Sequence, residues 1–297
     1  MAGSERPFAL KGPLGFLRPL DRWAAGYAGF TGVVLADGAL RGAPGCAREA
    51  LVSLAALVAV LAMAWATRTT RRRVPTVLRL FLVPILFTSF YRQIATLWPL
   101  LWPGPLDGIL AQWDAALFGV QPSQAFRAAL PWRWLSELFC FAYVAYYFFT
   151  PVVGLTVLVR RGYLAAERIL LSVTLCFFAC YTFFWLLPTV APHFWFPPHR
   201  GPQLYDGYVF NHLLFLFTSR GEIAGGAFPS SHLAVAVLYT LWARRSAPGL
   251  FPYLAVITGL MLPAVVYLGA HYAVDVPTGV LTGLLAYRLR RGPADPG

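Results

Sequence analysis

The sequence predicts an all-α polytopic membrane protein, and its composition, apolar segments and arginine placement all indicate that class. Apolar residues make up 58% of the 297 positions and charged residues only 12%, whereas soluble domains average about 45–50% and about 25%. Seven apolar segments are each long enough, or nearly so, to cross a bilayer as a helix of about 20 residues. This composition excludes a soluble globular enzyme, a disordered chain and a small secreted domain framed by disulfides.

The N-terminal part of the chain carries the weakest span signal. Gly, Pro and Arg interrupt every apolar run in residues 1–49, and we expect no cleaved signal peptide there. Residues 24–36 are mildly apolar, but Asp37 and the nearby glycines argue against a span. We therefore expect residues 1–49 to be an interfacial or flexible segment. Residues 50–75 are expected to form an extra transmembrane helix, followed by a basic loop.

Residues 76–290 are expected to form a membrane-embedded core. Its apolar segments are 76–102, 134–159, 169–190, 227–243, 250–268 and 272–289. The stretch 103–133 is amphipathic and predicts an interfacial helix, with Asp107 and Asp114 on a solvated face or at a cap. Residues 191–226 form a second long loop, and residues 291–297 form a short C-terminal tail.

Arginines mark the two sides of the membrane. Loops on one side contain Arg68, Arg71, Arg72, Arg73, Arg160, Arg161, Arg168, Arg244, Arg245, Arg288, Arg290 and Arg291. Loops on the other side contain only Arg127, Arg133, Arg200 and Arg220. Because cytoplasmic loops are enriched in Arg and Lys, we expect a multi-pass protein of the cell membrane with a cytoplasmic C-terminus and both long loops outside. An odd number of spans then places the N-terminus outside, in conflict with the basic residues of 1–49.

The net charge of +12 is explained by the arginines that mark the membrane sides and does not require a charged binding partner. The arginines lie in short runs between apolar segments and do not cluster with aromatics in a basic domain, so no nucleic-acid partner is expected. Cys140, Cys176 and Cys180 lie within apolar segments, where cysteine behaves as a small hydrophobe. The sequence has no Cys/His spacing typical of a metal site, and we expect neither a metal nor a cofactor.

One motif with chemical potential opens the apolar segment at 227–243. It consists of two glycines, then Ala-Phe, then Pro229-Ser230-Ser231-His232. Proline suits a first helical turn, and the two serine hydroxyls lie beside the unpaired N–H groups of a helix start, which attract anions. His232 could give a proton to, or take one from, an anion held there.

A second motif is His271 followed four residues later by Asp275. Residues at this spacing share a helix face, so the carboxylate could accept a hydrogen bond from one ring nitrogen and leave the other as nucleophile or base. Ionisable groups inside apolar segments are candidates for function, because they are costly there without a partner.

The order of the spans brings these groups to one membrane face. The segment that begins near His232 starts at the same face as the tight turn at His271. Arg92 lies late in the segment that runs toward that face, and His193 and Arg200 lie in the loop that covers it. Basic and hydroxyl groups that converge in this way indicate an anionic ligand, most simply a phosphate.

These motifs resemble the signatures of the type-2 phosphatidic acid phosphatase superfamily. Pro-Ser-Ser-His, followed 39 residues later by His-x3-Asp, is similar to its second and third signatures. His193-x6-Arg200-Gly-Pro is similar to the first, with His for Lys and an inserted Gly. Ala264 and Val265 stand where the third signature has Ser-Arg. In this respect, and in the residues around both histidines, the chain is more similar to the inositol phosphorylceramide synthase branch.

The resemblance, which covers about 76–290, implies a fold and a set of roles. The fold is a six-helix core, here with one extra N-terminal span. His271 is implied to attack phosphorus and form a phosphohistidine, while Asp275 holds its tautomer. His232 is implied to protonate the leaving oxygen. The implied phosphate ligands are Arg200, His193, Ser230 and Ser231, with Arg92 as a further candidate.

The implied substrate is a membrane lipid phosphate bound from the bilayer at the extracytoplasmic face, and the positive side chains make a metal unnecessary. Transfer to water would make the protein a phosphatase. Transfer to an alcohol such as inositol would make it a phosphotransferase, and both alternatives stand at this point. A protein of a different functional class also remains an alternative, namely a transporter or channel in which the same His, Asp and Arg groups conduct protons or anions.

Structural interpretations stand beside the chemical ones. His271 and Asp275 could simply join two helices, and Arg92 could extend its guanidinium from a lipid-facing position toward the interface. His199 and His212 are expected to be loop or interface residues. A further group is expected to pack between helices or, alternatively, to contact the head group of the ligand, namely Glu137, Tyr143, Tyr146 and Tyr147.

Overall fold

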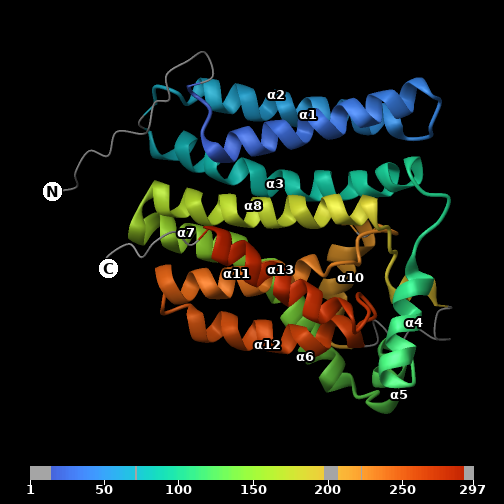
Figure 1. Ribbon diagram of the computed structural model, residues 1–297. Coiled ribbons are helices and arrows are strands. Elements are labelled where there is room, and N and C mark those ends of the chain that lie inside the picture. The colour runs from blue at the N-terminus through green and yellow to red at the C-terminus, as the bar shows by residue number, and fades with distance from the viewer. Residues whose placement is uncertain (1–14, 71, 197–206, 222, 291–297) are drawn as a thin grey trace. The chain divides into compact units, whose positions relative to one another are not determined.

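The computed structural model in Figure 1 describes residues 15–70, 72–196, 207–221 and 223–290. Over these ranges the protein contains thirteen α-helices, one short 3-10 helix and no strand, so the all-α prediction is confirmed. The chain divides into two compact units, residues 1–87 and 88–297. Helix α3 (Arg73–Leu97) begins in the first unit and ends in the second. The division lies within that helix, twelve residues beyond the boundary drawn from the sequence.

The first unit is built on a hairpin of α1 (Pro19–Leu40) and α2 (Cys46–Ala66). The two helices approach closely where Gly32 faces Ser53, because a Cβ atom at Gly32 would lie 3.2 Å from the Cβ of Ser53. The hydroxyls of Thr31 and Ser53 lie 3.3 Å apart at the same point. Small residues and interhelical hydrogen bonds of this kind stabilise helix pairs in membranes.

A buried ion pair joins the ends of three helices in this unit. Arg79 on α3 pairs with Asp21 on α1, and both side chains are almost fully buried. The Arg79 guanidinium also donates to the Thr67 hydroxyl at 3.1 Å, beyond the end of α2, and to the Phe16 carbonyl at 2.7 Å. The charges compensate each other, and this matters because an isolated buried charge is strongly unfavourable.

Residues 19–40 belong to the segment expected to be interfacial or flexible, and they form helix α1. Pro19–Leu40 is a continuous helix of 22 residues. Its low apolarity comes from glycines and two aspartates, whose structural roles the sequence does not reveal. Asp21 is neutralised by Arg79, and Asp37 forms an exposed pair with Arg41 at the far end of the helix.

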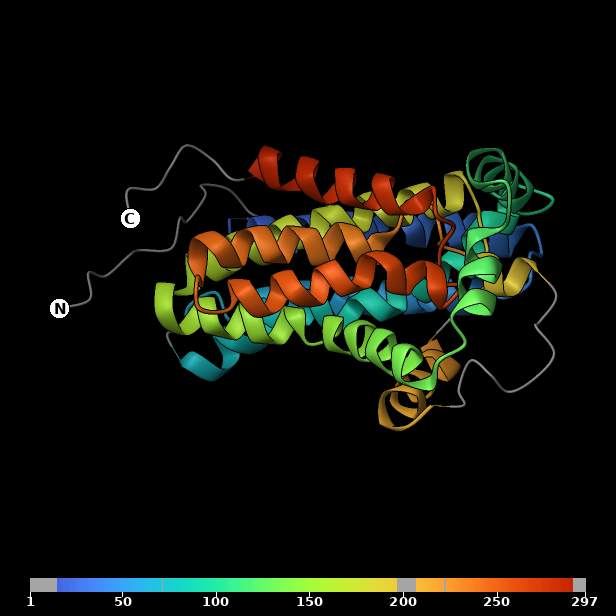
Figure 2. The same cartoon turned by 90° about the horizontal axis from the view of Figure 1, so that it is seen from below.

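The second unit contains the remainder of α3 and all later helices. Their bounds are η1 Trp98–Leu100, α4 Asp107–Phe118, α5 Pro122–Ala129, α6 Arg133–Tyr146, α7 Phe149–Arg161, α8 Tyr163–Leu186, α9 Pro192–Trp195, α10 Val209–Gly221, α11 Ser231–Ser246, α12 Phe251–Tyr267 and α13 Asp275–Arg290. Helix α11 is central and packs against α7, α8, α12 and α13. Figures 1 and 2 show it alongside α12 and α13.

Two glycines set the closest approach in this bundle. A Cβ atom at Gly279 would lie 2.7 Å from the Ser230 carbonyl oxygen, and one at Gly283 would lie 2.3 Å from that of Ala234. This Gly-x3-Gly spacing allows two helix backbones to touch. The first turns of α11 and α13 are thereby held together at one end of the bundle.

Fewer helices meet the criteria for a span than the seven segments predicted. Among the described residues, α2, Arg73–Leu100 and α8 are long and apolar enough to cross a membrane. The bent pair α6 and α7 adds a fourth if it counts as one span, with 45° between its halves. Helix α12 is apolar but has 17 residues, and α11 and α13 have 16 each, about 24 Å at 1.5 Å per residue. These helices are held by their neighbours in the bundle, so their own length and apolarity matter less.

Candidate active site at the start of helix α11

His232 lies in the first turn of α11, next to the residue that caps the helix. Ser230 is the N-cap, and its side-chain oxygen accepts a hydrogen bond from the Leu233 N–H at 3.4 Å. Pro229 precedes the cap and is not in the first turn, where the sequence predicted it. Ser230 and Ser231 are both buried, whereas His232 is half-buried. The hydroxyl of Ser230, one of the two expected to face an anion, is therefore already engaged in capping the helix.

His271 lies in the short turn between α12 and α13, and its side chain is only 1% exposed. Its own N–H donates to the Val265 carbonyl at 3.0 Å. Asp275 begins α13 and is fully buried. The expectation that the two share a helix face needs correction, because His271 precedes the helix. They still approach each other, with 3.5 Å between His271 Nδ1 and Asp275 Oδ2.

The hydrogen bonds around the two histidines form one directed chain. His271 Nδ1 lies 2.8 Å from the Ala227 carbonyl oxygen, which can only accept, so Nδ1 carries the hydrogen and Nε2 carries the lone pair in the neutral ring. His232 Nδ1 lies 3.3 Å from that Nε2 and must donate to it. His232 Nε2 is then an acceptor for the Tyr143 hydroxyl at 3.0 Å. Each ring is thus assigned a tautomer by its neighbours.

The Ala227 carbonyl takes the place that the sequence analysis gave to Asp275. It is the nearer acceptor for His271 Nδ1, while Asp275 Oδ2 accepts the Tyr272 N–H at 2.9 Å. Asp275 therefore contributes mainly a negative charge beside the protonated nitrogen. A backbone carbonyl leaves no trace in the residue types, so no sequence pattern could have identified it.

Three tyrosines enclose the His232 ring. The ring centroids of Tyr143, Tyr146 and Tyr147 lie 4.7, 5.2 and 6.5 Å from that of His232. They come from the end of α6 and the break before α7, at a spacing of three and four residues that puts them on one helix face. The sequence favoured helix packing for these tyrosines, with contact to the ligand head group as the alternative, and their spacing is the signal that supports the alternative.

His193 on α9 lies beside the turn that carries His271. Its Nδ1 is 2.9 Å from the Gly269 carbonyl oxygen, and its backbone N–H donates to the same atom at 3.1 Å. Gly269 has a φ of 70°, a conformation that suits glycine in a tight turn.

The other two arginine candidates are not brought to the histidines. Arg200 lies outside the described residues. Arg92 is exposed on α3 and forms no hydrogen bond or ion pair with another described side chain. The two candidate histidines away from the motifs also differ, because His199 lies outside the described residues and His212 is exposed on α10.

Asp107 and Asp114 contradict the expectation that they lie on a solvated face or at a cap. Both are fully buried on the inner side of α4. Burial raises the pKa of the Asp107 carboxyl, and hydrogen bonds from Val190 and Tyr272 oppose that change. Burial also raises the pKa of Asp114, against hydrogen bonds from the backbone of the His271 turn. Amphipathicity located the helix correctly, but it could not tell which polar residues face inward.

Glu137 on α6 has a separate structural task. Its carboxylate accepts hydrogen bonds from the backbone N–H groups of Val209 and Phe210 at 2.6 and 2.5 Å, at the start of α10. An anion at this position compensates the positive end of the helix dipole.

Among the described residues, no group of three or more His, Cys, Asp or Glu side chains is arranged to hold a metal ion.

Comparison with known families agrees with this geometry. The profile of the PAP2 superfamily matches residues 108–289, which is more than half of the chain and includes both histidine motifs. Comparisons with curated proteins and with solved structures gave no match. The match does not single out the inositol phosphorylceramide synthase branch. On the strength of the profile match, the chain belongs to the PAP2 superfamily, the type-2 phosphatidic acid phosphatases.

Proposed function

We propose that the protein transfers the phosphate of a membrane lipid through a covalent intermediate on His271. Membership of the superfamily supports a phosphatase-type enzyme that acts on lipid phosphates. The observation that carries the proposal is the position of His271 Nε2, which has its lone pair free of a proton and lies 3.3 Å from a donor on His232. A nucleophile with an adjacent proton carrier is the arrangement that covalent phosphoryl transfer requires.

The reaction has two steps. In the first, the lone pair of His271 Nε2 attacks phosphorus and the bond from phosphorus to the leaving oxygen breaks. His232, which takes up a proton from solvent at Nε2 when the anionic phosphate binds and is then an imidazolium, gives the leaving oxygen its Nδ1 proton and becomes neutral. The positive charge of the phosphohistidine ring is balanced by Asp275. In the second, the oxygen of an acceptor hydroxyl attacks phosphorus, His232 takes the proton of that hydroxyl, and the bond between phosphorus and Nε2 breaks. Both residues return to their starting state.

The contact between the imidazoles belongs to the resting state. A phosphorus atom in position for attack lies about 3–3.5 Å from the nucleophile, where the His232 nitrogen lies now. The substrate therefore displaces the half-buried His232 ring from Nε2 and receives the same hydrogen bond on its leaving oxygen. His193, Ser231 and Arg200 are proposed to hold the other phosphate oxygens as negative charge shifts during transfer. Exposed Arg92 has no structural support for that role.

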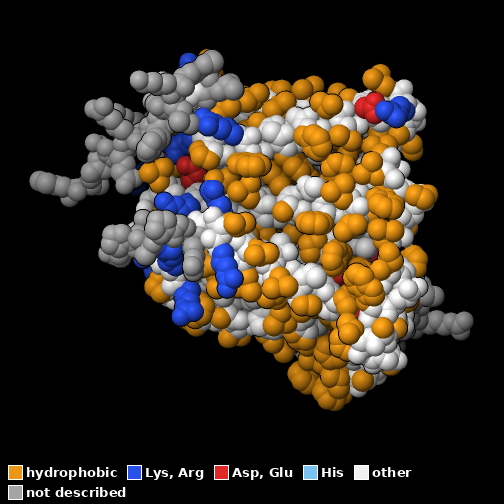
Figure 3. Space-filling model, viewed as in Figure 1, with side chains coloured by type: hydrophobic (Ala, Val, Ile, Leu, Met, Phe, Trp, Pro, Cys, Tyr) orange, Lys and Arg blue, Asp and Glu red, His pale blue; other side chains and the backbone are white. Residues whose placement is uncertain are grey.

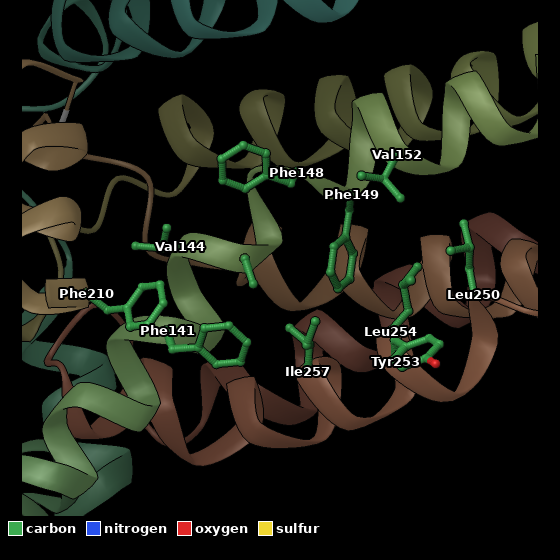
Figure 4. A pocket seen from close by; sticks show the side chains of 11 residues that line it. Phe141, Val144, Phe148, Phe149, Val152, Phe210, Leu250, Tyr253, Leu254 and Ile257 are labelled. Atoms are coloured by element: carbon green, nitrogen blue, oxygen red, sulfur yellow. The ribbon is translucent and has the colours of Figure 1, made fainter.

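An apolar groove beside the tyrosines supports a lipid substrate. The groove has a volume of about 340 Å³ and lies between α6, α7, α10 and α12. Figure 4 shows its lining, which includes Phe141, Val144, Phe148, Phe149, Leu254 and Ile257. The Phe149 ring lies 6.0 Å from Tyr146, which itself contacts His232. We propose that a hydrocarbon chain of the substrate lies in this groove while its phosphate reaches the histidines.

The positions of the arginines support an extracytoplasmic site. In the second unit, the end of α7, the end of α11 and the end of α13 each carry arginines in the last turn. Figure 3 shows basic side chains gathered at one end of the helices on this face. The starts of α11 and α13, with both motifs, lie at the opposite end of the second unit. Because basic ends are cytoplasmic, we propose that the histidines face the outer side and that the C-terminus is inside.

Helix α1 removes the conflict over the N-terminus. Its 22 residues extend about 33 Å, which is sufficient to cross a hydrocarbon core of about 30 Å. We propose that α1 is a span, together with α2, α3, α6–α7, α8, α11, α12 and α13. An even number of spans places the N-terminus with its basic residues on the cytoplasmic side.

The proposal is tested by trapping the covalent intermediate. Protein in detergent is quenched after brief exposure to a lipid phosphate labelled on phosphorus, and acid-labile, base-stable label on the protein is counted. We expect label in the wild type and in His212→Ala, which removes an exposed histidine, and none in His271→Ala. Label that persists in His271→Ala would refute the assignment of the nucleophile.

The acceptor is identified with the same labelled substrate. In parallel reactions without the quench, the labelled lipid is turned over in buffer alone or in buffer with a candidate alcohol such as inositol. Release of inorganic phosphate in both cases identifies a phosphatase. A new phosphodiester that forms only with the alcohol identifies a phosphotransferase.

A further inference from the structure

Helix α4 presents two contrasting faces. The inner face consists of buried residues at the spacing of one helix side, namely Asp107, Leu110, Ala111 and Asp114. The outer face exposes large apolar side chains, namely Ile109, Trp113, Leu117 and Phe118. Figure 1 shows α4 across the end of the bundle where α13 begins. The helix therefore buries two carboxylates and leaves apolar side chains outside, the reverse of a soluble amphipathic helix.

Asp107 holds two segments at once. Its Oδ1 accepts the Tyr272 hydroxyl at 2.7 Å, and its Oδ2 accepts the Val190 N–H at 2.7 Å. Tyr272 is fully buried and packs with Leu110 and Ala111 of α4 in one apolar cluster. Burial raises the pKa of the Tyr272 phenol, so the hydroxyl remains a donor to this carboxylate.

Asp114 binds the backbone of the turn that carries His271. Its two oxygens accept the N–H groups of Ala273 and Val274, each at 3.0 Å. Neither Asp107 nor Asp114 forms an ion pair with a described Lys or Arg. A buried carboxylate without a cation is costly unless several donors satisfy it, and here the donors belong to the residues that follow His271.

With Asp114 in place, each backbone N–H from His271 to Asp275 has an acceptor. His271 donates to the Val265 carbonyl, Tyr272 donates to Asp275, and Asp275 donates to the Tyr272 carbonyl. Among these residues, Ala273 and Val274 are the two donors whose acceptor comes from outside the turn and its flanking helices. Without a carboxylate from α4, these two partly buried N–H groups would lose their acceptor, and the turn would be held less firmly.

We propose that Asp107 and Asp114 are positioning residues, which hold the His271–Asp275 turn so that His271 Nε2 points toward His232. This inference rests on the proposed function for its catalytic meaning. Neither carboxylate contacts an imidazole in the structure, so each acts through the turn. A displacement of about 1 Å at the nucleophile can lower the rate of a reaction by about 100-fold, and the two carboxylates oppose such a displacement.

The main test uses Asp114→Asn and Asp107→Asn in the full-length protein. In Asp114→Asn, the amide keeps one acceptor but turns its N–H₂ toward one of the two backbone donors, so that contact becomes repulsive. In Asp107→Asn, the amide oxygen can still accept the Val190 N–H, but the Tyr272 hydroxyl must change from donor to acceptor. We expect kcat for phosphate transfer to fall about 10- to 100-fold, while KM changes less than about threefold. Asp37→Asn, an exposed carboxylate on α1, is the matched control and should behave as the wild type.

A second readout does not depend on activity. The rate at which diethyl pyrocarbonate modifies His271 is followed by peptide mass analysis, with exposed His212 as the internal reference. We expect His271 to react at least about fivefold faster in Asp114→Asn, because a loosened turn exposes a ring that is now buried. This readout works even if the wild type forms no phosphohistidine, so it separates failure of the inference from failure of the proposed function.

Tyr272→Phe is the milder variant if an aspartate substitution prevents folding. It removes one donor from Asp107 and leaves the turn backbone intact, so we expect about a threefold loss of kcat. Because the hydroxyl acts through Asp107, Tyr272→Phe combined with Asp107→Asn should be no slower than Asp107→Asn alone. Unchanged His271 reactivity and unchanged kcat in the folded variants, or additive losses in the double variant, would overturn the proposal.

Discussion

The two units bury aspartates in opposite ways. In the first unit, Asp21 is paired with Arg79, and the charges cancel where three helix ends meet. In the second unit, Asp107, Asp114 and Asp275 lie within or beside one turn, and none of them forms an ion pair with a described Lys or Arg. Their ligands are backbone N–H groups, a tyrosine hydroxyl and an imidazole. The first network joins helix ends through opposite charges, whereas the second joins helix α4 to the turn of His271 through hydrogen bonds.

The second network suits the proposed chemistry. A phosphohistidine ring bears a positive charge, which a carboxylate beside it would offset. Of the three aspartates, Asp275 lies nearest to the imidazole, at 3.5 Å from His271 Nδ1. Asp107 and Asp114 contact the turn and not the imidazole. The two units should therefore respond differently to mutation: loss of charge in the first unit should affect stability, and loss of charge in the second should affect the rate.

The largest effect is expected for Arg79→Ala. It leaves the Asp21 carboxylate buried without its cation, which costs about 3–5 kcal/mol in comparable cases. Unfolding in detergent measures the loss, and the label per folded molecule in the trapping assay should stay at the wild-type level. Arg41→Ala is the control, because it breaks an exposed pair worth about 0–1 kcal/mol. Equal losses in the two variants would contradict the structural role of the buried pair.

Asp275→Asn should produce the opposite pattern. The amide oxygen can still accept the Tyr272 N–H, so the melting temperature should change by only a few degrees. The negative charge beside His271 Nδ1 is lost, and we expect formation of the intermediate to slow by about 100-fold or more. Rapid-quench trapping measures that rate. A wild-type rate in Asp275→Asn would remove the distinction between the two networks.

A smaller effect is expected for Tyr143→Phe. The variant keeps the ring beside His232 and removes only the hydroxyl that donates to His232 Nε2 at 3.0 Å. Without that hydroxyl, a neutral His232 can also adopt the tautomer with its proton on Nε2, in which Nδ1 cannot donate. We therefore expect kcat to fall about three- to tenfold. Tyr147→Phe, on the exposed edge of the same group, serves as the comparison and should change kcat less. A larger loss in Tyr147→Phe would reverse the assignment.

The smallest effect is a change in pH profile for His193→Lys. His193 Nδ1 donates to the Gly269 carbonyl, so the ring can also donate from Nε2 to a phosphate oxygen only when it is positively charged. An imidazole loses that charge near neutral pH and a lysine does not. Wild-type activity should therefore fall as the pH rises above about 7, and the variant should retain activity to higher pH. Identical profiles would exclude His193 from phosphate binding.

Much of the architecture could be predicted from local patterns. The excess of apolar residues indicated a helical membrane protein, and the motifs around His232 and His271 were sufficient to place both histidines at one site. Prediction from the sequence failed for residues whose structural role depends on a partner far away in the chain. Nothing near Asp21 in the sequence indicated that its carboxylate would be buried and neutralised, because the neutralising Arg79 lies 58 positions away.

The candidate site shows the same limit. Tyr143 and Asp114 contact the two histidines or their turn, yet neither belongs to either motif, and Ala227 of the first motif contacts the histidine of the second. Their contacts join positions that are 44, 89 and 159 residues apart. Arg92 illustrates the reverse case, because span order placed it at the same face as the histidines but it is exposed and contacts neither of them.

The amino-acid order by itself determined the class of protein and the two histidine motifs, because apolar length and residue spacing act locally. The tertiary structure alone decided which tautomer each histidine adopts, which carboxylates are neutralised and which hold the turn of His271. Hydrogen bonds and charge compensation depend on distances in space, and packing sets those distances between segments far apart in the chain.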